Sequence, residues 1–230
     1  MLDKFNKLSN LLRGQQVPVK DKKFSAAVHP LGIIYCSNLL AKKIVNQGEK
    51  VVSSRPEAAF PIASVTVALW AEFPDFGDLL LAHFHRTCPY LVPILSERLL
   101  NETEEEYFRK LGFLYENGER EDLNIFLSRM SGVMRLYCAM MVINIRKELM
   151  KPHVIGLWEG WRWCASFVNQ EPRAEISATL LFVMLEVTGN ALLKKYRHQF
   201  QKLLHLICKS YIPKIDQVQV YKVSNWFIKF

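Results

Sequence analysis

Residues 79–90 read Leu79-Leu80-Leu81-Ala82-His83-Phe84-His85-Arg86-Thr87-Cys88-Pro89-Tyr90. The leucines together with Phe84 predict a helix that packs against a core, and Pro89 ends that helix because proline has no backbone N–H to donate. His85 and Arg86 then fall in the last turn, where positive charge is favourable against the helix dipole. The pattern predicts a buried helix whose basic end opens into a loop. Such an end is either an ordinary helix terminus or one wall of an anion-binding site.

Helical spacing of apolar residues continues on both sides of this stretch, with a proline at most of the breaks. The predicted helical segments are 33–45, 62–70, 124–149, 157–164 and 176–193. Residues 15–23 read as an exposed connection, and 218–230 as a strand fragment or tail without a partner. The pattern favours an all-α stack of antiparallel helix pairs of the solenoid class. We divide the chain into a basic N-terminal arm with a short helix (1–28), an all-helical domain (29–215) and a divergent tail (216–230).

Composition limits the functional classes. The chain of 230 residues is half apolar and carries a formal net charge of +8, which favours phosphates, nucleic acid, a membrane surface or an acidic protein as partners. Five cysteines without a CxxC pair are typical of reduced thiols. The N-terminus does not resemble a signal peptide, and no apolar stretch of the roughly 18 residues that span a membrane stands out. We therefore expect a soluble nuclear or cytosolic protein without membrane insertion.

The catalytic motifs that sequence alone can reveal are missing. The chain contains no GxxxxGK[ST] phosphate loop, GxGxxG, GxSxG or HExxH. His83, His85 and Cys88 are metal-ligand types, but a structural zinc site normally needs two such pairs at matching spacing. No cysteine has a base and an orienting acid beside it in the sequence. We predict no metal site and no enzymatic activity.

Two further segments are candidates for partner surfaces. Residues 157–164 contain three tryptophans, of which Trp161 is followed by Arg162, a pair of residue types enriched among interface hot spots. The alternative is aromatic packing between adjacent helices. Lys194 and Lys195 begin a stretch to Lys214 that contains no acidic residue. Residues 96–122, in contrast, are the acidic part of the chain, with Thr103 placed to cap a helix.

Ordered motifs point to a family. They are Glu57-Ala58-Ala59-Phe60-Pro61-Ile62-Ala63, Gly77-Asp78 running through the opening stretch, Arg129-Met130-Ser131-Gly132, Arg135-Leu136-Tyr137, Gly160-Trp161-Arg162-Trp163, Ala178-Thr179-Leu180-Leu181-Phe182 and Leu185-Glu186-Val187-Thr188-Gly189-Asn190-Ala191-Leu192. Together, from about Leu8 to about Ile215, the chain resembles the C-terminal domain of the Gle family of mRNA-export factors, nucleoporins on the cytoplasmic side of the nuclear pore. The resemblance implies a HEAT-like, all-helical fold, similar to the middle domain of the translation-initiation scaffold, and no catalysis.

The resemblance also implies partners and a location. Family members bind and stimulate the DEAD-box ATPase of mRNA export, in many cases with inositol hexakisphosphate bridging the two proteins, and they bind an FG-repeat nucleoporin. Translation initiation and termination factors are further expected partners. The implied location is the nucleus, the nuclear pore complex and the cytoplasm. Residues 217–230 depart from the family pattern, so the resemblance does not extend to the FG-nucleoporin contact, which relatives make with their C-terminal part.

The predicted inositol phosphate site combines basic residues from two helix ends: Lys42, Lys43, Lys50, His85 and Arg86. A ligand with several phosphates needs several converging cations, because one exposed ion pair contributes at most about 1 kcal/mol. The resemblance singles out Lys43 and Arg86, whereas Thr87 stands where relatives often carry a second lysine. Trp161, Arg162, Lys194 and Lys195 are the predicted partner surface.

Two other functions fit the residues. The first is a HEAT-like RNA-binding or translation scaffold that acts through its basic surface, for which strong, salt-sensitive RNA binding is expected. The second is an inositol phosphate enzyme, which lacks a catalytic constellation in the sequence.

Overall fold

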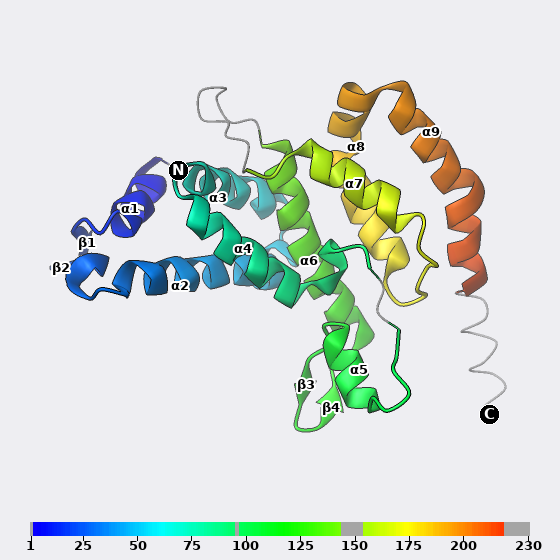
Figure 1. Cartoon of the computed structure of the whole chain (residues 1–230), viewed down its shortest axis with the longest axis horizontal. Coiled ribbons are helices and arrows are strands. Elements are labelled where there is room, and N and C mark those ends of the chain that lie inside the picture. Colours follow the sequence, from blue (N-terminus) through cyan, green and yellow to red (C-terminus); the bar gives the residue numbers. More distant parts are fainter. Residues whose placement is uncertain (1, 95–96, 144–153, 219–230) are drawn as a thin grey trace.

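The computed structural model describes residues 2–94, 97–143 and 154–218 (Figure 1). Its helices are α1 (Leu2–Leu12), α2 (Gly32–Gln47), α3 (Ala59–Glu72), α4 (Pro74–Thr87), α5 (Glu104–Lys110), α6 (Leu123–Val142), α7 (Leu157–Phe167), α8 (Ser177–Tyr196) and α9 (His198–Leu206). Two short hairpins are formed by β1 (Val17–Val19) with β2 (Lys22–Phe24) and by β3 (Tyr115–Glu116) with β4 (Glu119–Arg120). The predicted all-α class is confirmed, since both hairpins are small additions to a helical body.

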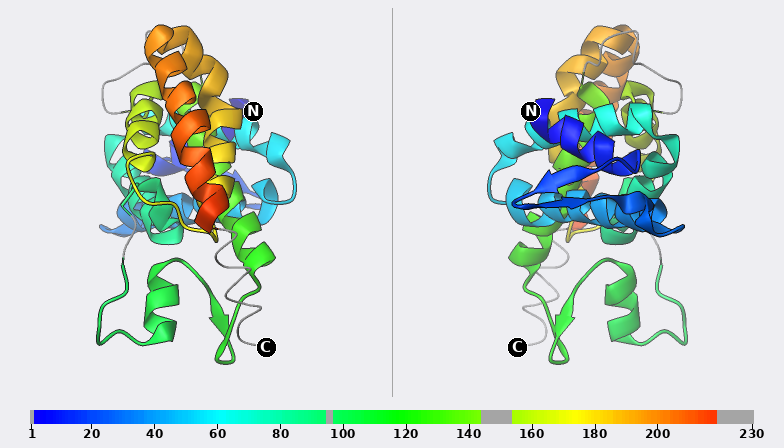
Figure 2. Two further views of the ribbon diagram at one scale, coloured as in Figure 1. Left: turned by 90° about the vertical axis from the view of Figure 1, so that its right-hand side faces the viewer. Right: turned by 90° about the vertical axis from the view of Figure 1, so that its left-hand side faces the viewer.

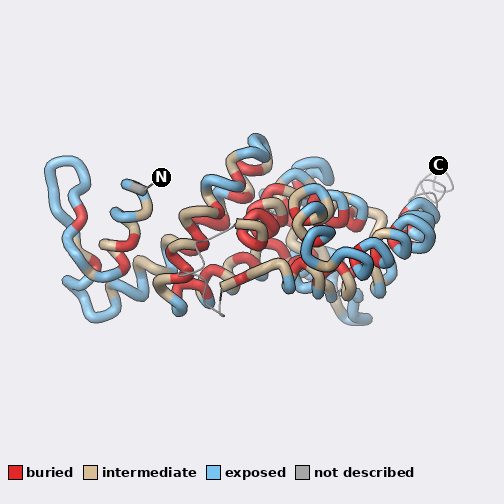
Figure 3. Tube along the Cα trace, turned by 90° about the horizontal axis from the view of Figure 1, so that it is seen from above, coloured by how far each residue is buried: buried red, intermediate tan, exposed pale blue. Residues whose placement is uncertain are grey.

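Helix α6 is the centre of the molecule and packs against α3 on one side and α8 on the other. Seen from above, the buried residues concentrate around it, while α1 and α9 lie at opposite ends of an elongated body (Figure 3). Phe126, Met130 and Met134 of α6 are completely buried. Gly132 lets α6 pass close to the π-helical turn Gly48–Val52 that follows α2, because a Cβ at this position would lie 2.3 Å from the carbonyl oxygen of Gly48.

Helices α2 and α4 lie side by side and run in the same direction. Their first halves share one cavity, which Ile34 and Leu79 both line, and their second halves share another, which Lys42 and Arg86 both line. Between the two cavities, Nε2 of His83 on α4 lies 2.7 Å from Oδ1 of Asn38 on α2. We call this line of contact the α2–α4 seam.

The acidic segment forms a projection from the body, made of α5 and the β3–β4 hairpin (Figure 2). Thr103 caps α5 as predicted: its hydroxyl accepts a hydrogen bond from the backbone N–H of Glu106, whose carboxylate accepts one from the backbone N–H of Thr103. Asn117 and Gly118 both have positive φ, which a tight two-residue hairpin turn requires. These two residues therefore form the turn that joins β3 to β4.

Three segments differ from the sequence expectations or extend beyond the described residues. Residues 15–23 are exposed as predicted, apart from the buried Val17, but Val17 to Phe24 also form the β1–β2 hairpin around a positive φ at Lys20. Strands of three residues are too short for an alternating pattern to show. The helix expected to run to residue 149 is described only to Val142, and the expectations for 144–149 and for most of the tail from 218 to 230 lie outside the described residues.

Within the described part of the chain, α6 and α8 are long and apolar enough to cross a membrane by length and composition alone, contrary to the expectation that no stretch would be. The apolar windows of the two helices are 61% and 39% buried within the fold, respectively. Core helices share this composition, because a helix surrounded by other helices is apolar around most of its circumference. The absence of membrane insertion remains a prediction.

All five cysteines are free thiols. Cys88, Cys138 and Cys164 are buried, and burial raises the pKa of Cys88 and of Cys164 to about 12. Cys36 on α2 is partly exposed, and Cys208, which follows α9, is exposed. Among the described residues, the thiols that solvent reaches are therefore Cys36 and Cys208, which lie toward opposite ends of the molecule.

Candidate anion-binding site

A cavity of about 440 Å³ lies where the second halves of α2 and α4 meet the loop that follows α5. Its walls come from α2, the turn after α2, α4, α5, residues 112–114 and α6. The lining residues are Lys42, Val45, Asn46, Glu49, His83, Arg86, Thr87, Arg109, Gly112, Phe113, Leu114 and Arg129. Basic and neutral polar side chains thus converge on the cavity, and Glu49 is its one acidic residue.

Three basic side chains face one another across the seam. Lys42 comes from α2, while His83 and Arg86, three residues apart, share a face of α4. Burial lowers the pKa of His83 below its ordinary value, and the positive charges of Arg86 and Lys42 lower it further. His83 therefore lies within electrostatic reach of both cations, in a position that favours an incoming anion.

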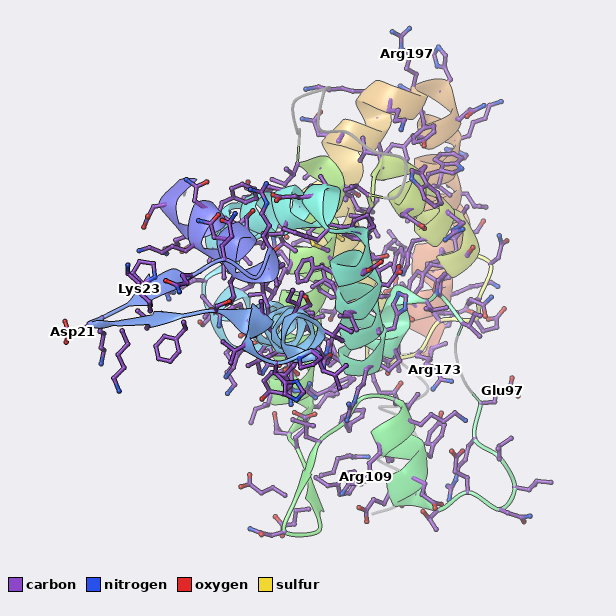
Figure 4. The ribbon with its side chains drawn as sticks, turned by 60° about the vertical axis from the view of Figure 1, so that its left-hand side comes forward. Asp21, Lys23, Glu97, Arg109, Arg173 and Arg197 are labelled. Carbon is purple, nitrogen blue, oxygen red and sulfur yellow. The ribbon has the colours of Figure 1, made fainter. Side chains whose placement is uncertain are left out.

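The projection contributes a fourth cation. Arg109 lies on α5, on the side of the β3–β4 hairpin (Figure 4), with its guanidinium 4.9 Å from the centre of the Tyr115 ring. It forms an exposed ion pair with Glu105 at 2.6 Å, one turn earlier on α5. Because α5 is separated from α2 by more than 50 residues, only the tertiary fold places Arg109 beside Lys42.

Arg129 and its partners form the floor of the cavity. Its guanidinium donates to Glu49 at 2.7 Å, to Glu121 at 2.5 Å and to the carbonyl oxygen of Gly112 at 2.7 Å. Burial opposes the charged guanidinium, but the two carboxylates outweigh this effect and raise the pKa of Arg129. The single guanidinium balances only one of its two carboxylate partners, but because it pairs directly with Glu49, this residue opposes an anion less than a free carboxylate would.

The structure separates the predicted basic residues into two groups. Lys42 and Arg86 line the cavity, but Lys43 and Lys50 are exposed and do not. Successive helix residues point about 100° apart, so Lys42 shares its face with Asn46 and Glu49, whereas Lys43 is turned away from α4. Lys43 and Lys50 therefore do not share this cavity with Lys42, and the inositol phosphate site predicted from the sequence stays a prediction.

His85 is also placed elsewhere. It lines a different cavity, of about 540 Å³, together with residues of α7 such as Trp158 and Arg162. It is adjacent to Arg86 in sequence but points to the other side of α4, and burial lowers its pKa. The predicted anion site, in contrast, does not include His83, which lines the 440 Å³ cavity. Its spacing of three residues from Arg86 and four from Thr87 was the available signal for a shared face.

The predicted partner surface is also divided between two places. The rings of Trp161 and Tyr196 lie 4.8 Å apart, and Lys195 extends over the same tyrosine, with its Nζ 5.5 Å from the ring centre. Arg162 points toward the 540 Å³ cavity, where it pairs with Glu159 at 2.7 Å and lies over Trp158. Lys194 is exposed near the end of α8.

Among the described residues, no three His, Cys, Asp or Glu side chains lie close enough to hold a metal ion.

Comparison with known families gives a match along most of the chain. Residues 1–208 match the family described as GLE1-like protein. The chain belongs to the GLE1 family. The mRNA export factor GLE1 of Danio rerio is 43% identical over 213 residues, covering 91% of this chain and 30% of the relative. That of Mus musculus is 42% identical over 228 residues, covering 98% of this chain and 32% of the relative. The chain thus spans about a third of the length of these GLE1 relatives.

The fold is found in a solved GLE1-family complex. A structure described as the C-terminal domain of a Dbp5 variant of S. cerevisiae bound to Gle1 and IP6 aligns with a TM-score of 0.81 and 22% sequence identity. The alignment covers 94% of this chain and 70% of that one. At this identity the comparison establishes the fold alone. The predicted resemblance to the Gle family is confirmed.

Proposed function

We propose that this chain is a non-catalytic activator of the DEAD-box RNA-dependent ATPase of nuclear mRNA export, acting at the cytoplasmic face of the nuclear pore. Inositol hexakisphosphate would bridge the two proteins. The observation that supports this most directly is the basic cavity between α2 and α4. The solved structure of similar fold, which holds Dbp5, Gle1 and IP6, supports the choice of partner and ligand.

The proposed ligand site consists of Lys42, His83, Arg86 and Arg109. Each exposed cation contributes at most about 1 kcal/mol, so the affinity must come from several phosphates bound at once. Lys42, Arg86 and Arg109 remain exposed at the rim of the cavity. A bound polyanion would therefore keep phosphates available to a second basic surface, as a bridging ligand requires.

The proposed mechanism assigns binding to helix ends and loops, and rigidity to the core. The chain would hold the two lobes of the ATPase in a partly open arrangement, which speeds release of RNA or of product. Buried residues of α6 such as Met130 and Met134 would act only by fixing the α2 and α4 ends relative to the rest. The chain's own residues perform no bond-breaking step in this scheme.

ATPase stimulation tests the proposal. Lys42→Gln/Arg86→Gln removes two positive charges from the cavity, whereas the matched control Lys43→Gln/Lys50→Gln removes two from the same region without touching its lining. Titration with inositol hexakisphosphate, in the presence of the ATPase and RNA, should show activation shifted to higher ligand concentration for the first variant only. Equal effects of the two variants would refute the assigned site. Absence of stimulation by the wild-type chain, with and without ligand, would refute the function.

The alternative function is an RNA-binding or translation scaffold that uses the basic segment from Lys194 to Lys214. Lys194, Lys195, Lys202 and Lys209 are exposed, while Lys214 pairs with Glu171 at 2.8 Å. RNA binding by the chain alone, with a steep dependence on salt, would favour this function. The FG-repeat nucleoporin and translation factors are further proposed partners, and binding assays with each purified protein would test them.

A further inference from the structure

A second cavity, of about 460 Å³, lies at the opposite end of the α2–α4 seam. It is bounded by α1, the first half of α2 and the turn that joins α3 to α4. The residues that line it are Leu12, Ile33, Ile34, Ser37, Glu72, Phe73, Pro74, Asp75, Phe76, Asp78 and Leu79. We call it the acidic groove, because its charged side chains are all carboxylates, the reverse of the basic cavity at the other end.

The walls of the acidic groove expose apolar side chains. Ile34 is 61% exposed and Ile33 37% exposed, and they continue into Leu31 and Tyr35, which are 62% and 66% exposed. Exposed apolar side chains that adjoin one another in this way are typical of protein interaction sites, whereas single exposed ones are not. Leu79 of α4 closes the opposite wall.

The carboxylates of the groove differ in their partners. Glu72 accepts a hydrogen bond from Ser9 at 2.8 Å and pairs with Arg13 at 2.5 Å, so its charge is neutralised within the chain. Asp75 and Asp78 are exposed, and no cation of the described residues lies within 4 Å of either carboxylate. Two free negative charges beside an apolar wall, in a chain of net charge +8, are complementary to a ligand that is both apolar and basic.

We propose that the acidic groove binds an amphipathic helix of a partner protein. The apolar face of that helix would pack on Ile33, Ile34 and Leu79, with lysine or arginine side chains placed against Asp75 and Asp78. Helices bind grooves in this manner through apolar residues spaced three and four apart. A second copy of this chain is disfavoured as the occupant, because two molecules of charge +8 repel each other. The proposal is independent of the anion site, from which the Asn38–His83 contact separates the groove.

The test uses a fluorescent helical peptide of about 15 residues, roughly four turns, with leucine on one face and lysine on its flanks. Its counterpart carries glutamate in place of lysine. Fluorescence anisotropy with the whole chain should show binding of the lysine peptide and much weaker binding of the glutamate peptide. The chain is basic overall, so non-specific electrostatic attraction would make the glutamate peptide bind more tightly. Tighter binding of the lysine peptide would therefore indicate a specific site.

Variants then locate the binding site. Asp75→Asn/Asp78→Asn should weaken binding of the lysine peptide about three- to tenfold, the effect of removing two exposed ion pairs. The matched control Glu116→Gln/Glu119→Gln removes the same charge from the distant β3–β4 hairpin and should leave the dissociation constant unchanged. Ile34→Ser, at an exposed position, tests the apolar wall by a second route if the aspartate variant melts at a lower temperature.

Three results would overturn the proposal. The first is equal binding of the two peptides or equal weakening by the control variant. The second is no binding of either peptide. The third is self-association of the chain in sedimentation experiments that Ile34→Ser abolishes, which would mean that a second copy occupies the groove.

Discussion

Replacing Arg129 with glutamine should destabilise the fold far more than removing an exposed charge does. The side chains of Arg129, Glu49 and Glu121 are only 12%, 18% and 10% exposed. Breaking a buried ion pair by removing one partner costs about 3–5 kcal/mol, because the remaining charge is left without compensation. Since some solvent reaches all three side chains, we expect a loss of about 3 kcal/mol, at the lower end of that range.

Urea unfolding followed by circular dichroism measures this loss, as a shift of the midpoint at unchanged slope. The control is Lys7→Gln, which breaks an exposed ion pair with Asp3 one turn away and should cost less than about 0.5 kcal/mol. The triple variant Arg129→Gln/Glu49→Gln/Glu121→Gln should recover part of the loss, because it removes the unpaired carboxylates as well. A loss below about 1 kcal/mol, similar to that of Lys7→Gln, would refute the reasoning and show that solvent screens the network.

The same substitution should weaken polyanion binding. Without Arg129, the carboxylate of Glu49 faces the basic cavity uncompensated and repels phosphate groups. Calorimetric titration of Arg129→Gln with inositol hexakisphosphate should give a higher dissociation constant than for the wild type. The double variant Arg129→Gln/Glu49→Gln should regain affinity for inositol hexakisphosphate, because the repelling carboxylate is gone. It should remain less stable than the wild type, because the carboxylate of Glu121 still lacks its partner.

Three further predictions follow from single contacts. Burial and the positive charges of Arg86 and Lys42 lower the pKa of His83, so the neutral ring is favoured before an anion binds. A bound polyanion favours the charged ring, so its affinity should rise as the pH falls through the range in which His83 takes up a proton. The rise should be smaller in His83→Gln, and calorimetry at several pH values measures it. Gly132→Ala should lower the melting temperature strongly, by a loss of about 1–3 kcal/mol, because the added methyl group meets backbone atoms, whereas Gly189→Ala, in open space within a helix, should raise stability by about 0.5–1 kcal/mol in the same scans. Trp163→Phe should cost about 1–3 kcal/mol in urea unfolding, because it leaves the buried carbonyl oxygen of Tyr90 without the indole N–H that lies 2.9 Å away.

Helix positions could be predicted because they depend on local spacing. The apolar residues between 33 and 45 fall at three- and four-residue intervals, and α2 forms over Gly32–Gln47. The end of α8 is harder to predict, because the chain turns at Arg197, which adopts a positive φ without being glycine or asparagine.

The site was less predictable than the helices that carry it. The sequence places lysines on α2 but does not say which side faces α4, so Lys42 and Lys43 could not be distinguished. Their difference depends on the packing of α4 against the side of α2 that carries Asn38 and Lys42. The presence of Arg109 in the cavity wall depends on how the projection packs against the helical body. That packing involves residues far apart in the sequence, so local spacing does not predict it.

The distribution of thiols leaves one accessible cysteine near each end of the molecule. A maleimide reacts with thiolates, so the buried thiols of Cys88 and Cys164, with a raised pKa, should stay unmodified in the folded chain. Cys36 on α2, at one end of the stack, and Cys208 after α9, at the other, are then the natural attachment points among the described residues. A donor and an acceptor dye on this pair would report whether the helical stack bends when a partner binds, without introducing any new cysteine.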